Sequence, residues 1–214
     1  MVLYIILAVL IAYLLGSIPS AVWFGKLFYG TDVREYGSGN SGATNVFRVL
    51  GYKAGIPVLA FDVFKGWLAI QLVNWFPVPG LQPDPMVYIK IGVAVAVFLG
   101  HVFPLYAGFR GGKGVGTLAG VAIALYPLAL LVVVGVFILI FAITRYVSLS
   151  SILAALSFPF IVIFISGERN FALIGLAVLV AIVIPVTHRK NIKRLLHGEE
   201  RKIVFKRKDG QSQT

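Results

Sequence analysis

The chain has 214 residues, of which 59% are hydrophobic and only 13% are charged. A soluble domain carries about 25% charged residues, so this composition excludes an ordinary soluble protein and predicts an all-α, polytopic integral membrane protein. The net charge of +11 therefore reports membrane topology first, we expect no nucleic acid partner, and the absence of cysteine excludes disulfides and thiol chemistry.

The first apolar stretch, about residues 3–24, has no basic segment before it. We expect it to be a retained membrane span and not a cleaved signal peptide. Gly16-Ser17-Ile18-Pro19-Ser20 in its second half predicts a kink or an opened turn. The polar segment 25–52 follows, and its cations, together with Lys53, outnumber its acidic residues. This excess predicts a cytoplasmic location for the segment and places the N-terminus outside.

A second span, about residues 54–76, carries Asp62 and Lys65. They are three residues apart, so they share one helix face and can pair. The loop 77–85 has no cation and fits the outside, and a third span, about 86–106, returns the chain to the cytoplasm. That span contains His101, for which a hydrogen-bonded place inside the bundle is favoured over a catalytic role.

Residues 118–144 allow two interpretations. As one span, they would leave the basic C-terminal tail outside, against the preference of Lys and Arg for the cytoplasm. A break at Tyr126-Pro127 into two short helices that enter the membrane and return removes the conflict. Spans at about 152–165 and 171–186 then complete about seven helices, some short or half-spanning, with the N-terminus outside and the C-terminus cytoplasmic.

We expect one membrane-embedded domain, residues 1–198. The basic residues 199–214 that follow it are expected to form a disordered cytoplasmic tail.

The stretch 108–117, Gly-Phe-Arg-Gly-Gly-Lys-Gly-Val-Gly-Thr, combines five glycines with two cations. Backbone N–H groups in such a turn can form an anion nest, to which a following helix adds its positive end. It is not a Walker A loop, because glycine follows the lysine and apolar spans flank the stretch. The alternative is a flexible membrane loop whose cations mark the cytoplasmic side. The residues expected to bind phosphate are Gly111, Gly112, Lys113, Gly114 and Thr117.

Two other polar segments belong to the same side. Residues 37–48 place hydroxyls and amides, including Ser38, Ser41 and Asn45, ahead of Arg48, which can bind phosphate bidentately. The alternative is a turn that caps a helix.

In the segment 188–200, a helix would put His188 and Asn191 on one face. A basic helix lying on anionic lipid is the alternative for this segment. Arg145 marks topology or binds phosphate, and both interpretations stay open.

Acid–base groups are scarce near these segments. No two carboxylates pair there, no HExxH or GxSxG motif occurs, and no histidine is followed five residues later by aspartate. A cation-rich site of this kind suits positioning and charge stabilisation better than nucleophilic catalysis. We expect neither a metal nor a cofactor.

Three segments together resemble the motifs of the bacterial acyl-phosphate-dependent glycerol-3-phosphate acyltransferases (PlsY type): Gly37–Asn45 with Arg48, Gly111–Gly114, and His188 with Asn191 through Glu200. The resemblance implies a seven-helix enzyme of the bacterial inner membrane whose active site faces the cytoplasm. The implied reaction transfers an acyl chain from acyl phosphate to the sn-1 hydroxyl of glycerol 3-phosphate. Its product is lysophosphatidic acid, in the first step of phospholipid synthesis.

The resemblance also implies glycerol 3-phosphate, acyl phosphate and membrane lipid as partners, and it implies roles for individual residues. The catalytic set is Ser38, Arg48, Lys113, His188 and Asn191. The phosphate-binding set is Ser41, Asn45, Arg48, Gly111, Gly112, Lys113, Gly114, Thr117, Arg145 and Glu200. Gly116 stands where alanine is expected, and Glu199 beside Glu200 leaves open which glutamate matters. A substrate phosphate could serve as the base. The competing class is a membrane carrier for an organic phosphate, although the motifs lie on one face and not at the midplane.

Overall fold

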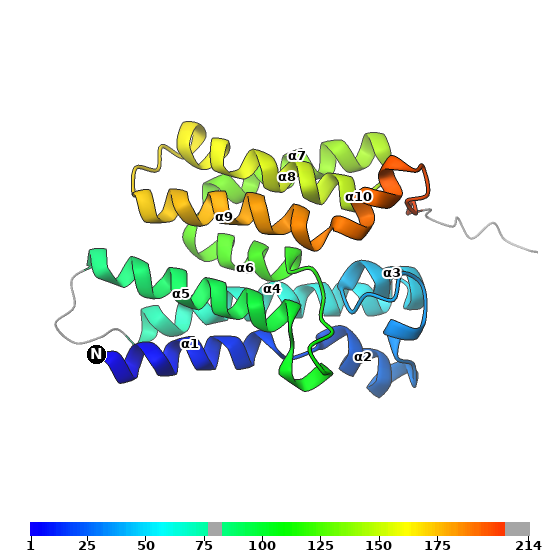
Figure 1. The fold of residues 1–214 in the computed structure, drawn as a ribbon, viewed down its shortest axis with the longest axis horizontal. Coiled ribbons are helices and arrows are strands. Elements are labelled where there is room, and N and C mark those ends of the chain that lie inside the picture. Colours follow the sequence, from blue (N-terminus) through cyan, green and yellow to red (C-terminus); the bar gives the residue numbers. More distant parts are fainter. Residues whose placement is uncertain (77–82, 204–214) are drawn as a thin grey trace, which may run out of the picture.

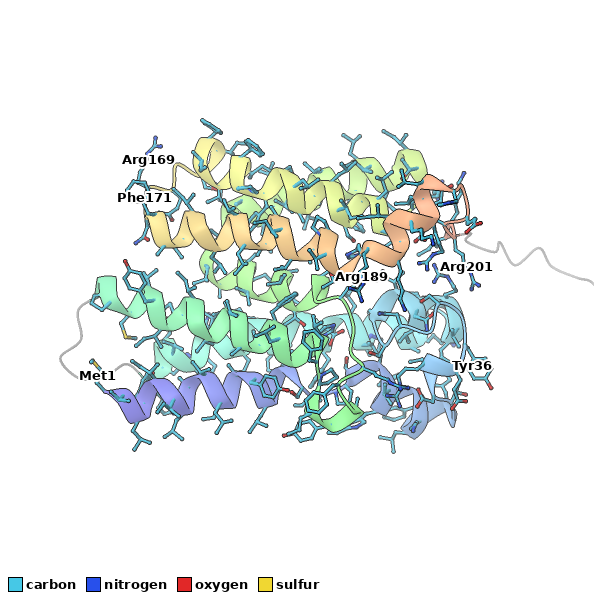
Figure 2. The ribbon with its side chains drawn as sticks, in the orientation of Figure 1. Met1, Tyr36, Arg169, Phe171, Arg189 and Arg201 are labelled. Carbon is cyan, nitrogen blue, oxygen red and sulfur yellow. The ribbon has the colours of Figure 1, made fainter. Side chains whose placement is uncertain are left out.

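The computed structural model describes residues 1–76 and 83–203, and every regular element within these ranges is helical. The long helices lie side by side along one axis (Figure 1). Met1 and Arg169 lie at one end of the bundle, and Tyr36 and Arg201 lie at the other (Figure 2). The predicted all-α membrane fold is confirmed. The cation-free loop expected on the outside lies largely beyond the described residues.

The α-helices are α1 (Val2–Gly16), α2 (Ser20–Tyr29), α3 (Ala43–Leu50), α4 (Tyr52–Trp75), α5 (Pro83–Val102), α6 (Val115–Leu125), α7 (Pro127–Thr144), α8 (Val147–Phe160), α9 (Phe171–Thr187) and α10 (Arg189–Leu196). Short 3₁₀ turns at Val33–Glu35 and Leu105–Ala107 and a π-helical turn at Ile161–Ile165 complete the regular structure of the described chain.

Within the described ranges, four helices are long and apolar enough to cross a membrane, and two bent pairs raise the number of spans to six. One pair is α1–α2, bent by 40°, and the other is α9–α10, bent by 61°. The first bend falls within the predicted stretch 16–20, because Pro19 cannot continue the hydrogen-bond ladder of α1. The shorter apolar helix α6 is the seventh membrane element.

The predicted break at Tyr126-Pro127 is present. Pro127 begins α7, where its missing N–H leaves no helical bond unmade. Both ends of the α6–α7 pair lie at the same end of the bundle. Lys113 before α6 hydrogen-bonds Asn191, and the Arg145 carbonyl after α7 accepts from the Ile203 N–H. The pair therefore enters and returns, but only α6 is short, since α7 has 18 residues.

Helices α4 and α6 pack backbone to backbone through glycines. A methyl group on Gly120 would overlap the Val63 carbonyl of α4, and one on Gly66 would overlap the Thr117 carbonyl of α6. Small residues allow this close approach in membranes, where packing and not hydrophobic burial drives helix association. The contact fixes the start of α6, and with it Lys113, against the first half of the bundle.

We expect Gly120→Ala to lower the melting temperature of the purified protein by about 5–10 °C, because overpacking costs about 1–3 kcal/mol or more where backbone must move. Gly135→Ala in α7 is the matched control, since nothing lies within 4 Å of the added methyl group. Thermal unfolding of both variants in one detergent checks the expectation. Equal melting temperatures would show that α4 and α6 do not pack in this way.

The expected disorder of the tail is wrong for its first residues. Glu200 bonds Ser148, Arg201 donates to the Gly37 carbonyl, and the Ile203 N–H donates to Arg145. Residues 199–203 therefore join three separate parts of the bundle at one end. The expectation for 204–214 falls outside the described residues.

Candidate active site

A cavity of about 910 Å³ lies between α3, α6, α7, α8, α9 and the segment 200–203. Polar side chains gather at one end, including Ser38, Arg48, Lys113, His188, Asn191 and Glu200. The rest of the cavity, called here the apolar arm, is lined by apolar side chains, including Val133, Phe137, Phe141, Ala154, Phe158 and Ile184. The cavity is thus amphipathic, and its shape and chemistry suit a molecule with an anionic head and a hydrocarbon chain.

Besides Arg201, whose guanidinium donates to the Gly37 carbonyl, two cations face the polar end, Arg48 and Lys113. The half-buried Arg48 guanidinium has no hydrogen-bond or ion-pair partner within residues 1–76 and 83–203. Lys113 Nζ lies 2.5 Å from Asn191 Oδ1. Burial lowers the pKa of the Lys113 ammonium to about 8, against the opposing effect of the Glu200 carboxylate. An anion entering the cavity would compensate both cations.

Glu200 organises the third segment. Its Oε1 accepts from Ser148 Oγ at 2.8 Å and from Asn191 Nδ2 at 2.6 Å, and its Oε2 accepts from Arg194 Nε at 2.7 Å. Burial opposes ionisation, but these hydrogen bonds outweigh it and lower the pKa of the carboxyl group. Glu199 is exposed. Of the two adjacent glutamates, Glu200 is the one that faces the site.

His188 is 3% exposed and lines the cavity. Its Nδ1 lies 2.8 Å from the Ile184 carbonyl oxygen. A carbonyl can only accept, so Nδ1 carries the ring hydrogen and Nε2 has an unshared electron pair. The histidine can therefore accept a hydrogen bond from a substrate hydroxyl.

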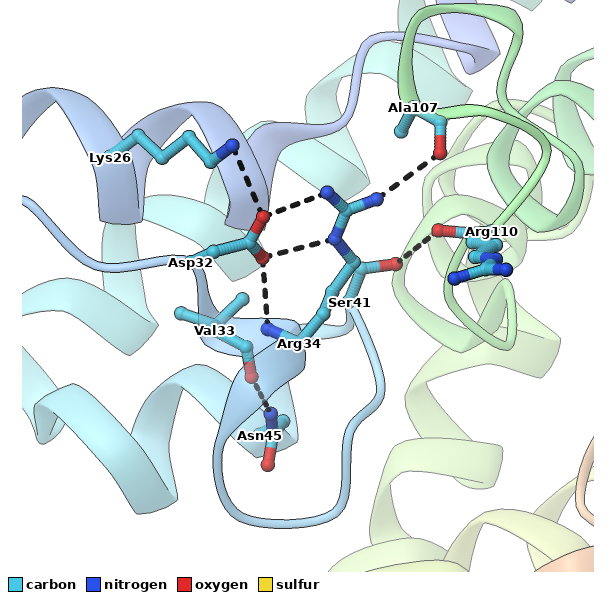
Figure 3. Close-up of polar contacts among 8 residues, drawn as sticks. All are labelled: Lys26, Asp32, Val33, Arg34, Ser41, Asn45, Ala107 and Arg110. Atoms are coloured by element: carbon cyan, nitrogen blue, oxygen red, sulfur yellow. Dashed lines mark hydrogen bonds and ion pairs between the residues drawn. The ribbon is translucent and has the colours of Figure 1, made fainter.

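The first polar segment is held by its own contacts (Figure 3). Arg34 pairs with Asp32 at 2.7 Å and donates to the Ala107 carbonyl at 3.2 Å, which ties the segment to the loop before α6. Ser41 Oγ donates to the Arg110 carbonyl at 3.2 Å. The hydroxyl expected to bind phosphate thus joins two loops, and Ser41 is buried.

Asn45 has a similar positioning role. Its Nδ2 donates to the carbonyls of Val33 and Tyr36, so both amide hydrogens are taken. Its Oδ1 accepts from the N–H and the hydroxyl of Ser38 at 2.8 and 3.1 Å. The expected phosphate contact through Asn45 is therefore corrected. Asn45 holds Ser38 at the cavity, where the lone pairs of the serine oxygen stay available.

The backbone hydrogen bonds of the glycine-rich turn differ from the expectation. The N–H groups of Gly111 and Gly112 donate to the carbonyls of Val102 and His101, at 3.1 and 3.2 Å, and so cannot cradle a phosphate. The unpaired N–H groups are those of the first turn of α6, after Gly114, whose φ of 82° favours glycine. The backbone N–H groups that stay available to an anion are therefore those of Val115 and Gly116, beside Lys113.

Two further predicted residues lie away from the cavity. Thr117 is fully buried, and its hydroxyl lies 3.1 Å from His101 Nδ1. Arg145 is exposed and ends α7 with a φ of 61°, and it is not among the residues that line the cavity. The structure supports a helix-ending role for Arg145, and its expected contact with a phosphate stays a prediction.

Sequence reasoning missed Arg201, Ser148 and the apolar arm. Arg201 escaped because its segment was expected to be disordered. Ser148 lies in a polar segment that could have been assigned to the site from its position beside Arg145. The apolar arm could not be recognised from the sequence, because helices such as α7 are apolar on every side.

Comparisons with known proteins agree with this geometry. A family model described as glycerol-3-phosphate acyltransferase matches residues 6–198. A glycerol-3-phosphate acyltransferase of Chlorobaculum tepidum is 41% identical, covering 94% of this chain and 97% of the relative. One from Staphylococcus haemolyticus is 43% identical, covering 94% and 98%.

Two solved structures are also similar. They are crystal structures of PlsY, an integral membrane glycerol 3-phosphate acyltransferase. The glycerol 3-phosphate form has a TM-score of 0.83 and 38% identity, and the lysophosphatidic acid form has 0.81 and 37%. Each match covers 94% of this chain and 96% of the other.

Proposed function

Since the chain belongs to the glycerol-3-phosphate acyltransferase family, we propose that its cavity transfers an acyl chain from acyl phosphate to glycerol 3-phosphate. The products are lysophosphatidic acid and inorganic phosphate. The chain is a multi-pass membrane enzyme. The choice of acyl phosphate as donor follows the family resemblance, and the amphipathic cavity is compatible with it.

The carrying observation is the amphipathic cavity. Helix α6 begins at the unpaired N–H groups beside Lys113 and continues along the apolar arm through Ala119 and Ala122. A donor whose chain follows α6 would therefore place its phosphate at the positive end of the helix. Glycerol 3-phosphate would then bind at the other cation, Arg48, with Ser38 nearby. The two cations are thus assigned to two phosphates.

The reaction needs no covalent enzyme intermediate. The sn-1 hydroxyl oxygen attacks the acyl carbonyl carbon, the bond from that carbon to the phosphate oxygen breaks, and phosphate leaves with its electron pair. Lys113 and the α6 N–H groups stabilise the negative charge on the leaving phosphate. The hydroxyl proton passes to a nearby acceptor, either His188 Nε2 or a substrate phosphate. Asn191 and Glu200 hold Lys113 in place.

The test is an assay in detergent micelles, without a sealed membrane, a gradient, added metal or cofactor. We expect purified protein to form lysophosphatidic acid from acyl phosphate and glycerol 3-phosphate, because both substrates bind in one cavity and neither has to cross a membrane. Acyl-CoA and acyl carrier protein replace acyl phosphate in parallel reactions to identify the donor. The competing carrier would form no product in micelles and would take up phosphate esters into vesicles. Uptake without product would refute the proposed function.

We further propose that the site faces the cytoplasm of a bacterial inner membrane, with the N-terminus outside. The site end of the bundle carries the basic helix α10, in agreement with the preference of Lys and Arg for the cytoplasm. Single cysteines at the exposed positions Glu35, Arg145 and Glu199 are expected to react from the cytoplasmic side, and one at Arg169 from the outside. The native chain lacks cysteine, so it is the unlabelled control. Labelling of the Arg145 position from the outside, opposite to Glu35, would contradict the return of α6–α7.

A further inference from the structure

A buried polar cluster lies beneath the glycine-rich turn, and the proposed chemistry does not use it. Asp62 and Lys65 of α4 pair at 2.9 Å, and His101 of α5 has its Nδ1 3.6 Å from Asp62 Oδ1. Their exposures are 2%, 1% and 7%. Ser20 donates to Asp62 at 2.7 Å, and Lys65 donates to the Ile18 carbonyl at 3.1 Å. The cluster thus joins α4 and α5 to the break between α1 and α2.

A buried ion pair contributes little stability compared with a well-packed apolar pair, because both ions lose their hydration. The presence of this cluster therefore calls for a role other than stability. The contacts of His101 indicate one.

His101 contacts the turn 112–117 at two places, one before and one after the exposed part of that turn. Before that part, its carbonyl accepts from the Gly112 N–H, and its ring packs against Gly112 so closely that a methyl group there would overlap Nε2. After that part, its Nδ1 lies 3.1 Å from the hydroxyl of Thr117. Lys113 and the first N–H groups of α6 lie between these two contacts. His101 therefore holds both ends of the anion-binding turn, one through its carbonyl and the packing of its ring and the other through its Nδ1 atom.

The His101 Nε2 atom has no hydrogen-bond partner among the described residues, and His101 also lines the main cavity. His101 lines a second, small cavity of about 10 Å³, together with Lys65, Ser20, Ser41, Gly111 and Gly112. This volume corresponds to about one water molecule. Lys65 has a third N–H without a protein partner, and the Ser41 oxygen can accept. One water would have enough polar partners there.

We propose that His101 is a positioning residue for the acyl donor, held by the Asp62–Lys65 pair and by one buried water. It keeps the turn 112–117 in the conformation that aims Lys113 and the α6 N–H groups at the donor phosphate. The inference rests on the proposed function and deepens it. It assigns this cluster to the donor phosphate and not to the glycerol 3-phosphate held by Arg48.

The test compares His101→Phe with His101→Gln in the micelle assay. Phenylalanine fills the space but removes both nitrogens, so we expect KM for acyl phosphate to rise about 10-fold, as for the loss of one to two hydrogen bonds. The KM for glycerol 3-phosphate is expected to stay within about twofold, because Arg48 is untouched. The glutamine amide can reach the buried water, so His101→Gln is expected to recover most of the loss.

A second variant covers the case in which His101→Phe does not fold. Thr117→Val keeps the shape and removes only the hydroxyl next to Nδ1, and we expect the same selective rise of about 3- to 10-fold. Ser157→Ala removes a hydroxyl elsewhere in the bundle and is the control, with unchanged KM for both substrates. A high-resolution structure is expected to show the water between Lys65 and His101.

A purely structural role predicts another pattern. It would lower the melting temperature and the active fraction, and leave both KM values unchanged or raise both equally. That pattern, or unchanged kinetics in folded variants, overturns the inference. Wild-type protein without product would instead overturn the proposed function, so the two failures are distinguishable.

Discussion

Lys113→Ala is expected to lower kcat/KM for acyl phosphate by roughly 10- to 150-fold, the equivalent of about 1.5–3 kcal/mol for a charge-assisted hydrogen bond. Lys113 is half-buried beside the N-terminus of α6 and lines the cavity. No other lysine lines this cavity in the described part of the chain. Initial rates in micelles measure the loss, and thermal unfolding shows that the variant is folded.

The pH dependence provides the control. The pKa of Lys113 is lowered to about 8, so its charged fraction falls as pH rises through that value. The kcat/KM for acyl phosphate reports groups of the free enzyme, so it should decline above about pH 8 in the wild type. Lys113→Arg keeps its charge throughout and should lose this decline, whatever its absolute rate. A decline that persists unchanged in Lys113→Arg would assign it to another group.

Glu200→Ala is expected to lower the free energy of unfolding by about 3–5 kcal/mol, because it removes the buried carboxylate that compensates the part-buried cations Arg194 and Lys113. The side chain is 5% exposed, and its loss leaves Arg194, Asn191 and Ser148 without their acceptor. Asn191 would no longer be held against Lys113. Both the melting temperature and kcat/KM should therefore fall together, in contrast to Lys113→Ala, which should leave folding largely intact.

Glu199→Ala is the matched control, since the neighbouring carboxylate is exposed, and wild-type values are expected. Glu200→Gln keeps an acceptor for Asn191 and Ser148 but removes the charge. Its melting temperature and kcat/KM should therefore lie between those of the wild type and of Glu200→Ala. Equal effects at both positions would mean that the segment 199–203 does not dock as described.

Much of the fold could be predicted because membrane helices are specified by length, apolarity and breakers. Pro19 and Pro127 each stop a hydrogen-bond ladder, and both breaks are where the sequence indicates. The length of α7 was underestimated because a break says where a helix begins and nothing about how far it continues. The segment 199–203 was misjudged because its order depends on Glu200 reaching partners distant in sequence, which local composition does not reveal.

The candidate site shows the same division. Residue types predicted the cations and the amide donors at the cavity, and Arg48, Lys113, His188 and Asn191 do line it together. Sequence could not separate residues that face a ligand from those that hold the loop. Asn45, Ser41 and Gly112 carry the chemistry of a phosphate site, but their donors are occupied by carbonyls. Only the three-dimensional count of hydrogen bonds distinguishes the two roles.

The exposure of α7 has a kinetic consequence. Only 6% of the residues in this helix are buried by the rest of the protein. Its residues Val133, Phe137 and Phe141 form one wall of the apolar arm. A single helix thus separates the substrate chain from the surrounding lipid. The acyl donor and the lysophospholipid product can exchange sideways with one leaflet and need not dissolve in water. The relevant concentration of donor is then its mole fraction in the bilayer or micelle. Adding inert detergent while the bulk concentration of donor is kept constant should therefore slow the enzyme by surface dilution.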